Sequence, residues 1–180
     1  MKIVAFAGSN SEKSINFQLV TFAASLFDTA EIKLLKTADF ETHLYSPERE
    51  LETGIPQLIL DFAQEISSAD LVLLSLAEHN GSYSAAFKNL YDWISRIPNR
   101  KVFDNKPLIL LSTSPGARGG QSVLQSAAER FPRDGAELIG TFSLPSFGQN
   151  FDRDKQEIVD AKLKMELRSI VENAKAIVKI

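Results

Sequence analysis

The residues that could do chemistry fall in three short polar stretches, each directly after an apolar run. The first stretch, GSNSEKSIN, brings together the hydroxyl and amide side chains of Ser9, Ser11, Ser14 and Asn16, and Gly8 before them is expected to let the chain turn sharply. Hydroxyls beside free N–H groups at a helix start suit a phosphate, because the helix dipole favours negative charge there. The same residues fit a plain turn in which Ser11 or Ser14 caps a helix, so both interpretations stay open for this stretch alone.

The second and third stretches offer backbone rather than side-chain donors. In EHNGS, Asn80 and Gly81 form a turn dipeptide that tolerates positive φ and exposes N–H groups. Such donors suit the electron-accepting edge of a planar heteroaromatic ring, and the alternative is a plain strand-to-helix turn. The third stretch, STSPGARGGQS, allows the close approach of a ring edge or a second phosphate, because it contains Pro115, Gly116, Gly119 and Gly120.

Several other chemistries are excluded or disfavoured. The chain has no cysteine, which excludes disulfides, thiolate nucleophiles and cysteine-based zinc sites. Its only two histidines, His43 and His79, are far apart in sequence, so no metal site is expected. Neither a complete P-loop pattern nor a G-x-G-x-x-G fingerprint occurs, which disfavours a nucleoside triphosphate or a Rossmann-type dinucleotide site. The absence of G-x-S-x-G disfavours an α/β-hydrolase.

The bulk composition favours a single domain spanning residues 1–180. The chain is 44% hydrophobic, with a formal net charge of −3 and a pI of about 5.5, and it lacks the basic excess of a nucleic-acid binder. No apolar run approaches the roughly 18 residues that a membrane helix needs. The apolar stretch in MKIVAFAGSN is too short for a signal-peptide core. We therefore expect no nucleic-acid or membrane partner and a cytoplasmic location.

The elements that must position the polar stretches alternate along the chain. Continuous apolar runs predict five buried strands, at residues 2–7, 31–36, 70–77, 106–114 and 136–144. Apolar residues at helical spacing predict helices at residues 14–27, 56–69, 84–97, 119–131 and 154–180. Residues 37–54 are polar and irregular, and we expect an excursion on the surface rather than a pocket wall.

Buried strands that alternate with helices indicate a parallel sheet covered on both faces. We therefore predict an α/β protein, a flavodoxin-like three-layer sandwich with a five-stranded parallel sheet in the order 2-1-3-4-5. Ligands on such sheets bind beyond the carboxyl ends of the strands, at the switch point between strands 1 and 3. The three polar stretches follow strands 1, 3 and 4, so we expect them to meet at this edge.

Together, GSNSEKSIN, EHNGSYSAAFKNLYDWISR and STSPGARGG resemble the NADPH-dependent FMN reductase family, which includes flavodoxin-like quinone, azo-dye and chromate reductases. The resemblance covers residue 2 to about residue 145, and its most specific part contains Lys88, Asn89, Asp92 and Trp93. It implies a flavodoxin-like fold with FMN bound non-covalently. It also implies a homodimer or homotetramer whose helical interface includes residues 84–97.

The resemblance assigns roles to individual residues. The FMN phosphate would be held by the loop around Ser11, through Ser9, Ser14, Asn16 and the backbone amides of Ile15 and Phe17. The isoalloxazine ring would be bordered by Glu78, His79, Asn80 and Gly81. The ribityl chain and the pyrimidine end of the ring would meet residues 112–116, among them Ser112, Thr113, Ser114 and Gly116.

Two positions depart from the family pattern. The loop arginine of the family is Ser11 here, and a charged hydrogen bond of that kind is worth roughly 1.5–3 kcal/mol. We therefore expect FMN binding about 10-fold weaker, unless Lys13 substitutes, and tighter binding in Ser11→Arg. The proline and tyrosine of the second motif are Ala77 and His79, which leaves the choice of electron acceptor open.

The implied activity is a ping-pong oxidoreduction. NADPH or NADH would deliver a hydride to the flavin and leave, and a small acceptor would then take the electrons: a flavin, a quinone, an azo dye or a metal oxyanion. No side chain need act as acid or base, although His79 is a candidate modulator because imidazole titrates near neutrality. Two alternatives remain: a non-enzymatic electron carrier of the flavodoxin type, and a flavodoxin-fold binding protein that has lost FMN, which the departures at Ser11 and His79 would allow.

Overall fold

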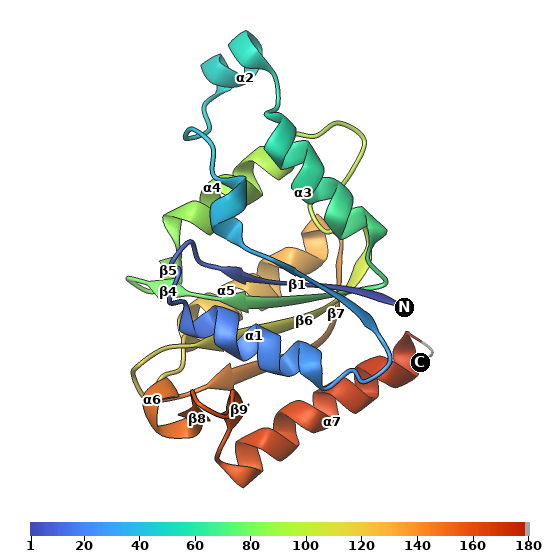
Figure 1. Cartoon of the computed structure of the whole chain (residues 1–180). Helices are drawn as coiled ribbons and strands as arrows, with labels where there is room; N and C mark the ends of the chain where they lie inside the picture. Colours follow the sequence, from blue (N-terminus) through green and yellow to red (C-terminus); the bar gives the residue numbers. More distant parts are fainter. Residues whose placement is uncertain (179–180) are drawn as a thin grey trace.

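The five predicted strands form one parallel sheet in the computed structural model, which describes residues 1–178 (Figure 1). The strands are β1 (Lys2–Gly8), β2 (Glu31–Leu35), β3 (Leu71–Leu76), β6 (Lys106–Thr113) and β7 (Ala136–Leu144). Their spatial order is β2-β1-β3-β6-β7, which is the predicted order 2-1-3-4-5. The flavodoxin-like prediction is therefore confirmed.

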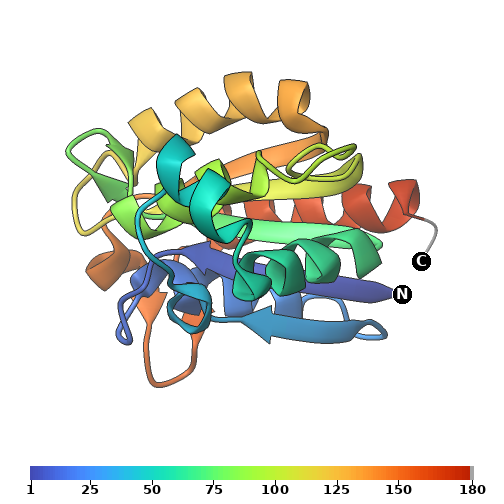
Figure 2. The ribbon, with the colours of Figure 1, turned by 90° about the horizontal axis from the view of Figure 1, so that it is seen from above.

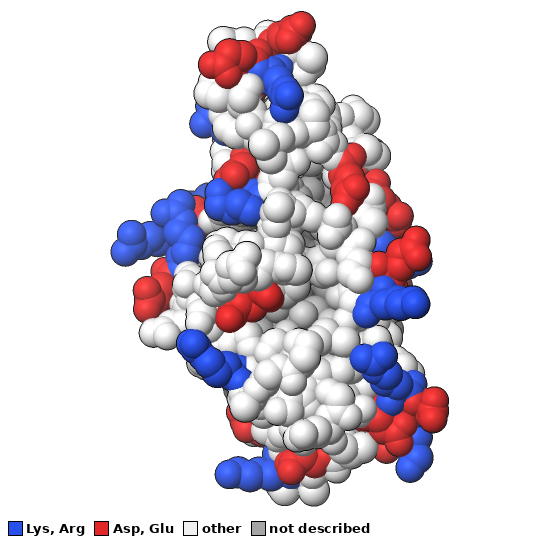
Figure 3. Space-filling view, turned by 90° about the vertical axis from the view of Figure 1, so that its left-hand side faces the viewer, with Lys and Arg blue, Asp and Glu red and all other residues white. Residues whose placement is uncertain are grey.

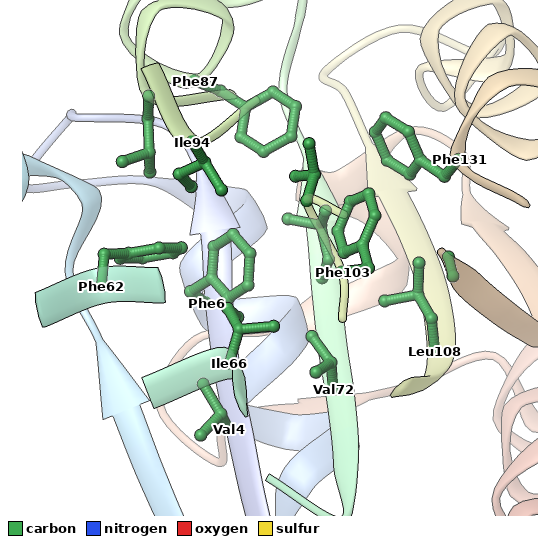
Figure 4. Packing of buried hydrophobic residues seen from close by; sticks show 14 of the residues in the cluster. Val4, Phe6, Phe62, Ile66, Val72, Phe87, Ile94, Phe103, Leu108 and Phe131 are labelled. Carbon is green, nitrogen blue, oxygen red and sulfur yellow. The ribbon is translucent and has the colours of Figure 1, made fainter. Parts of the chain in front are cut away.

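The central strands are apolar throughout because both faces of the sheet are covered. Along β1, Val4 and Phe6 point to one face, while Ile3 and Ala5 point to the other, and all four are buried. The first face carries most of the aromatic core, whose side chains point toward one another between sheet and helices in Figure 4. Alternation with period two thus builds two separate cores on one sheet.

Two layers of helices cover these faces. The helices α3 (Gln57–Ser68), α4 (Ala85–Ile94) and α5 (Gln121–Arg130) lie on one side and are seen side by side from above in Figure 2. The helices α1 (Ile15–Ser25) and α7 (Ala161–Ile177) lie on the other side. The three-layer arrangement was predicted, and most helix ends fall within a few residues of the expected positions.

The last predicted helix starts seven residues too early. Residues 147–158 form a short helix and a two-stranded ribbon, namely α6 (Phe147–Asn150), β8 (Phe151–Asp152) and β9 (Glu157–Ile158). Phe147 and Phe151 are drawn into the core, and Asp160 then caps α7 by accepting a 2.9 Å hydrogen bond from the N–H of Leu163. An aspartate at the N-cap marks the start of a helix, but Asp160 is hard to recognise in the sequence because several other charged residues precede it. The predicted helix also ran to residue 180, and residues 179–180 lie outside the described part.

The segment predicted to be irregular contains a 3-10 turn, η1 (Thr37–Phe40), and a short helix, α2 (Pro47–Thr53). Ser46 caps α2 and Pro47 occupies its first turn, both favourable positions. Phe40 meets Phe62 edge to face at 4.9 Å, so the segment is partly core rather than only surface. Residues 41–54, which we call the arm, carry α2 away from the rest of the molecule, as Figure 1 shows.

No helix within residues 1–178 is both long enough and apolar enough to span a membrane. The same residues contain no cluster of three or more His, Cys, Asp or Glu side chains suited to a metal ion.

Candidate functional site

The three polar stretches meet at the carboxyl edge of the sheet, which faces the viewer in Figure 3. They follow β1, β3 and β6, which are adjacent strands. Acidic and basic side chains are intermixed around the rim of this edge, and much of its middle is uncharged. The fold thus brings the predicted site residues together as expected.

The start of α1 leaves two backbone donors without a partner. Ser14 is the N-cap: its Oγ accepts a 3.1 Å hydrogen bond from the N–H of Phe17, and its own N–H donates to the carbonyl of Ser11 at 3.1 Å. The N–H groups of Ile15 and Asn16 have no acceptor within residues 1–178. The expected donor Phe17 is therefore engaged by the cap, and the free donors at this helix start are Ile15 and Asn16.

The side chain of Asn16 points inward instead of into the loop. It is 3% exposed; its amide donates to the carbonyl of Thr113 at 3.1 Å, and its Oδ1 accepts from the Thr113 N–H at 3.0 Å. Oδ1 also accepts from the hydroxyl of Ser75 at 2.7 Å. Asn16 therefore ties α1 to β3 and β6, and only its backbone N–H faces the position proposed for a phosphate.

Gly8 is required for packing and not for a sharp turn. It ends β1 without a positive φ, and a Cβ at this position would lie 3.0 Å from Leu76 and 3.2 Å from the Phe87 ring. Its carbonyl accepts a 2.8 Å hydrogen bond from Ser84, the N-cap of α4. The expectation of a turn at Gly8 was wrong, because the close approach of α4 explains the glycine.

A hollow of about 360 Å³ opens beside the first polar stretch. Its walls come from residues 9–12, from Phe17, and from Lys36 and Ala38, which lie directly after β2 and in η1. Ser9 is half-buried, while Ser11 and Lys36 are exposed. We call this space the Ser9 hollow. It combines two hydroxyls and one cation, which suit an anion, with the carboxylate of Glu12, which opposes one.

The second stretch is a β-hairpin rather than a simple turn. It contains β4 (Glu78–His79) and β5 (Ser82–Tyr83), joined by Asn80 with φ 53° and Gly81 with φ 76°. Two successive positive φ angles define a type I′ turn, the connection that an Asn-Gly dipeptide favours. Asn80, Gly81 and the neighbouring His79 are exposed, so the turn presents its backbone to a ligand.

Glu78 holds this hairpin against α5. Its Oε2 accepts a 3.0 Å hydrogen bond from the N–H of Val123 in the first turn of α5. The N-cap of α5 is Gly120, which has no side chain to serve that N–H. A carboxylate from another element therefore replaces the missing cap and gains from the helix dipole. Glu78 is a positioning residue whose side chain is already occupied.

The ring of Tyr83 in the hairpin packs against other aromatic rings. Its ring stacks on Phe131 at 6.0 Å, and Tyr91 lies close to both rings. Burial, and then the negative charge of Asp134, raises the pKa of the Tyr83 hydroxyl. Burial and a hydrogen bond to Asp134 likewise raise the pKa of Tyr91. Both phenols therefore stay protonated at neutral pH, and their rings pack against Phe131.

The third stretch divides into an inner and an outer part. The hydroxyl of Ser112 donates to the carbonyl of Gly119 at 2.8 Å, and the hydroxyl of Thr113 donates to the carbonyl of Leu144 at 2.7 Å. Both side chains are buried and engaged within the protein. Ser114 is half-buried and Gly116 is exposed. Of the four residues expected to meet a ribityl chain, only these two are accessible.

Sequence reasoning missed four residues that shape this edge: Lys36, Thr37, Ser75 and Ser84. The hydroxyl of Thr37 donates to the carbonyl of Ala7 at 2.5 Å and fixes the end of β2 against β1. Ser75 lies inside an apolar run, where a serine carries no separate signal, whereas Ser84 begins the predicted helix 84–97, where a serine is a typical N-cap. Lys36 could have been found from the sequence, because it is the last residue of the strand predicted at 31–36 and such a residue lies at the carboxyl edge.

Comparisons with known proteins agree with this geometry. The family model described as NADPH-dependent FMN reductase matches residues 1–147. An NADPH:quinone oxidoreductase of Arabidopsis thaliana is 31% identical over 126 residues, which cover 68% of this chain and 62% of the relative. A 2-hydroxy-1,4-benzoquinone reductase of a Burkholderia species is 34% identical over 125 residues, 66% of this chain and 63% of the relative. The matches thus span somewhat less than two thirds of the length of these two curated relatives.

The fold has close counterparts among solved structures. The flavoenzyme NAD(P)H:(acceptor) oxidoreductase FerB from Paracoccus denitrificans superimposes with a TM-score of 0.76 at 23% identity, covering 99% of this chain and 95% of the other. This similarity supports the fold, and the match to the family model extends over all three polar stretches. The chain belongs to the NADPH-dependent FMN reductase family.

Proposed function

We propose that this protein is an NAD(P)H-dependent oxidoreductase that binds FMN at the carboxyl edge of its sheet. The observation that carries the proposal is the set of unpaired donors at the start of α1, where Ile15 and Asn16 present N–H groups next to serine hydroxyls. A helix N-terminus with free donors is an anion site, and FMN carries one phosphate monoester.

The donor set of the edge fits FMN from end to end. The phosphate would be held by the N–H groups of Ile15 and Asn16 with the hydroxyls of Ser9 and Ser11. The ribityl chain would pass the accessible part of the third stretch, at Ser114 and Gly116. The ring would lie against the exposed backbone of the type I′ turn, which supplies hydrogen-bond donors to its polar edge. These assignments retain the predicted loops, replace the Asn16 side chain by its backbone, and omit the Ser14 hydroxyl and the Phe17 N–H, which bond to each other in the helix cap.

FMN, when bound, supplies the redox chemistry, a ping-pong exchange of electrons between NADPH or NADH and a second small molecule. The protein's residues bind and orient: Asn16 and Glu78 fix the loops, and the turn at Asn80 donates hydrogen bonds from rigid backbone. We propose a quinone as the acceptor, because two relatives are named for quinone reduction. His79, exposed beside the turn, is the residue proposed to modulate the reaction with that acceptor.

A flavin titration followed by reduction tests this function. FMN added to the purified protein should lose fluorescence on binding, and NADPH added without air should bleach the bound flavin with no partner reductase. A quinone should then restore the colour. Flavin binding without bleaching by NADPH or NADH would instead indicate an electron carrier, and a protein that binds no FMN would contradict the proposal.

The phosphate contact can be tested at a single backbone atom. Ile15 occupies the first helical position, where proline is tolerated, and Ser14 already has φ −57° and ψ 119°, which suits a residue before proline. Ile15→Pro therefore removes one free N–H with little effect on the helix. We expect weaker binding of FMN but unchanged binding of riboflavin, which lacks the phosphate. Ile15→Ala, which keeps the N–H, is the matched control and should bind both flavins normally.

We also propose a homodimer, in which the arm is covered by the second copy. Leu44 and Leu51 on the arm are 67% and 88% exposed, and Leu58 at the start of α3 is 42% exposed. The arm is held firmly to α4, because Asn89 bonds to backbone groups of residues 42–45 and Trp93 donates to the carbonyl of His43 at 3.0 Å. The predicted interface helix α4 thus contributes by anchoring the arm, while its apolar side chains face the core.

Light scattering after gel filtration tests this assembly. Leu51→Glu should convert the dimer to a monomer, because it places a charge in the apolar contact. Met165→Glu is the control, since Met165 is 66% exposed on α7 at the opposite face. A wild-type monomer, or a Leu51→Glu dimer as stable as the wild type, would contradict the arm as the interface.

A further inference from the structure

We propose that Lys36, at the end of β2, supplies the positive charge that pairs with the phosphate of FMN, in place of the arginine that the family pattern has at the position of Ser11. This inference rests on the proposed function and adds a residue that lies outside the three motif loops. It replaces Lys13, the cation favoured by sequence proximity.

Lys36 lies beside the loop Ser9–Ser14 because β2, which it follows, pairs with β1, which precedes that loop. β2 runs parallel to β1 with Leu35 opposite Phe6, so Lys36 leaves the sheet next to the start of the Ser9–Ser14 loop. Lys36 lines the Ser9 hollow together with Ser9 and Ser11. Lys13 belongs to the same loop but is not among the residues that line this space. The cation and the hydroxyls therefore face one space from two different elements.

The backbone beside Lys36 is fixed in place. The hydroxyl of Thr37, which is 3% exposed, donates to the carbonyl of Ala7 at 2.5 Å. Thr37 also begins η1, whose Phe40 packs into the core against Phe62. The Cα of Lys36 is thus held at the rim of the hollow, and only its side chain remains free to follow a ligand. A positioned stem reduces the entropy lost when the ammonium group binds an anion.

Lys36 has no carboxylate partner within residues 1–178, whereas the neighbouring lysines of the same sheet do. Lys2 and Lys33 both pair with Glu65, at 3.1 Å and 2.5 Å, at the other end of the strands. Lys36 forms no ion pair at the carboxyl edge, although its side chain is exposed there. An unpaired lysine that lines the same hollow as the two serines is available for an external anion.

The local charge balance makes this lysine necessary. Glu12 also lines the Ser9 hollow, and Glu41 lies nearby, with its carboxylate accepting a hydrogen bond from Asn10 at 2.5 Å. Two carboxylates oppose the binding of a phosphate, and the helix start offsets only about half an elementary charge. Without an arginine in the loop, Lys36 is the cation in the lining of the hollow that offsets these carboxylates.

The test compares two flavins and two lysines. Lys36→Met and Lys13→Met each remove one charge from an exposed position and keep an aliphatic stem, so both variants should fold like the wild type. Fluorescence quenching gives the dissociation constants for FMN and riboflavin. We expect Lys36→Met to weaken FMN binding about 10-fold and leave riboflavin unchanged, the loss of one charged contact. Lys13→Met should change either constant by less than about twofold.

Two further variants sharpen the result. Ser11→Arg in the Lys36→Met background should recover most of the lost FMN affinity, because it returns the charge to the family position. Glu12→Gln should tighten FMN binding and leave riboflavin unchanged. Equal losses for both flavins, or the phosphate-specific loss in Lys13→Met instead, would overturn the role of Lys36. A wild type that binds FMN with no change in Lys36→Met overturns this inference alone, whereas a wild type that binds neither flavin overturns the proposed function as well.

Discussion

The two edges of the sheet differ in whether their polar groups have partners within the protein. At the amino edge, Glu65 accepts from both Lys2 and Lys33, and the N–H of Lys2 donates to Asp70 at 2.8 Å. At the carboxyl edge, the N–H groups of Ile15 and Asn16 and the ammonium group of Lys36 have no protein partner within residues 1–178. The same strands therefore carry a closed cluster of contacts around Glu65 on one side and an open set on the other.

The difference follows from the direction of the strands. Helices that follow parallel strands begin at the carboxyl edge, so their unpaired N–H groups and positive dipole ends gather there. Beneath these open groups lies a closed layer, in which the side chains of Asn16, Ser112 and Thr113 are engaged in hydrogen bonds within the protein. The carboxyl edge thus has two parts. The side chains of Asn16, Ser112 and Thr113 form a buried frame that fixes the loops, and exposed residues such as Ser11 and Lys36, the exposed tips, remain free for a ligand.

The largest expected effect comes from breaking the buried frame. Asn16→Ala removes three hydrogen bonds, one from the Ser75 hydroxyl and two with the backbone N–H and carbonyl of Thr113. Each unsatisfied buried group costs about 1–3 kcal/mol, so we expect a loss of about 3 kcal/mol in the free energy of unfolding. Urea denaturation should show a lower midpoint with an unchanged slope.

A matched substitution at an exposed tip should leave the stability almost unchanged. Ser11→Ala removes an exposed hydroxyl, which is expected to change the unfolding free energy by less than about 0.5 kcal/mol. A similar loss of stability in both variants would mean that the buried frame and the exposed tips are not distinct.

The next largest effect separates two glycines of the third stretch. Gly119 has φ 59°, and a Cβ there would lie 2.4 Å from the Ser143 hydroxyl, whereas a Cβ on Gly116 would meet only the Ser114 hydroxyl at 3.9 Å. We expect Gly119→Ala to lower stability by about 2 kcal/mol, through the positive φ and the steric overlap. Gly116→Ala should stay within about 0.5 kcal/mol. Thermal unfolding of the two variants under identical conditions measures this difference, and equal melting temperatures would contradict it.

Much of the fold could be predicted because apolar runs such as those in β1 and β3 carry the pattern of a sheet buried on both faces. Residues 37–54 and 147–158 were harder. Their short elements are anchored by Phe40 and Phe151, which contact the distant Phe62 and Phe22, although Phe151 also stacks on the nearby Phe147. Local periodicity does not report such contacts.

The candidate site was predictable to the level of loops but not of individual atoms. Asn16 and Glu78 were correctly placed at the edge, yet their side chains bond to Thr113 and Val123, distant residues that spacing cannot reveal. Lys36 was missed because a lysine at the end of an edge strand is ordinary, and its role depends on the neighbouring loop. A residue type indicates what a side chain can do, and only the fold decides whether it is already occupied.

The smallest expected effect lies at the closed amino edge. The hydrogen bond from Lys33, reinforced by Lys2, lowers the pKa of Glu65 despite its partial burial. A lowered folded-state pKa contributes stability above the ordinary glutamate pKa of about 4.3, and this contribution is lost as the pH falls through the folded-state value. At pH 7, Glu65→Gln should cost only about 0.5–1 kcal/mol, because the pair is partly exposed.

Two readouts connect this variant to the comparison of the two edges. In urea titrations, the stability difference between wild type and Glu65→Gln should shrink as the solution is acidified, because protonation removes the charge that the substitution removes. FMN affinity should stay unchanged at pH 7, since Glu65 contacts only groups at the opposite end of the strands. A loss of FMN affinity comparable to that of Lys36→Met would show that the amino edge also shapes the site, and that closed contacts there do more than stabilise the fold.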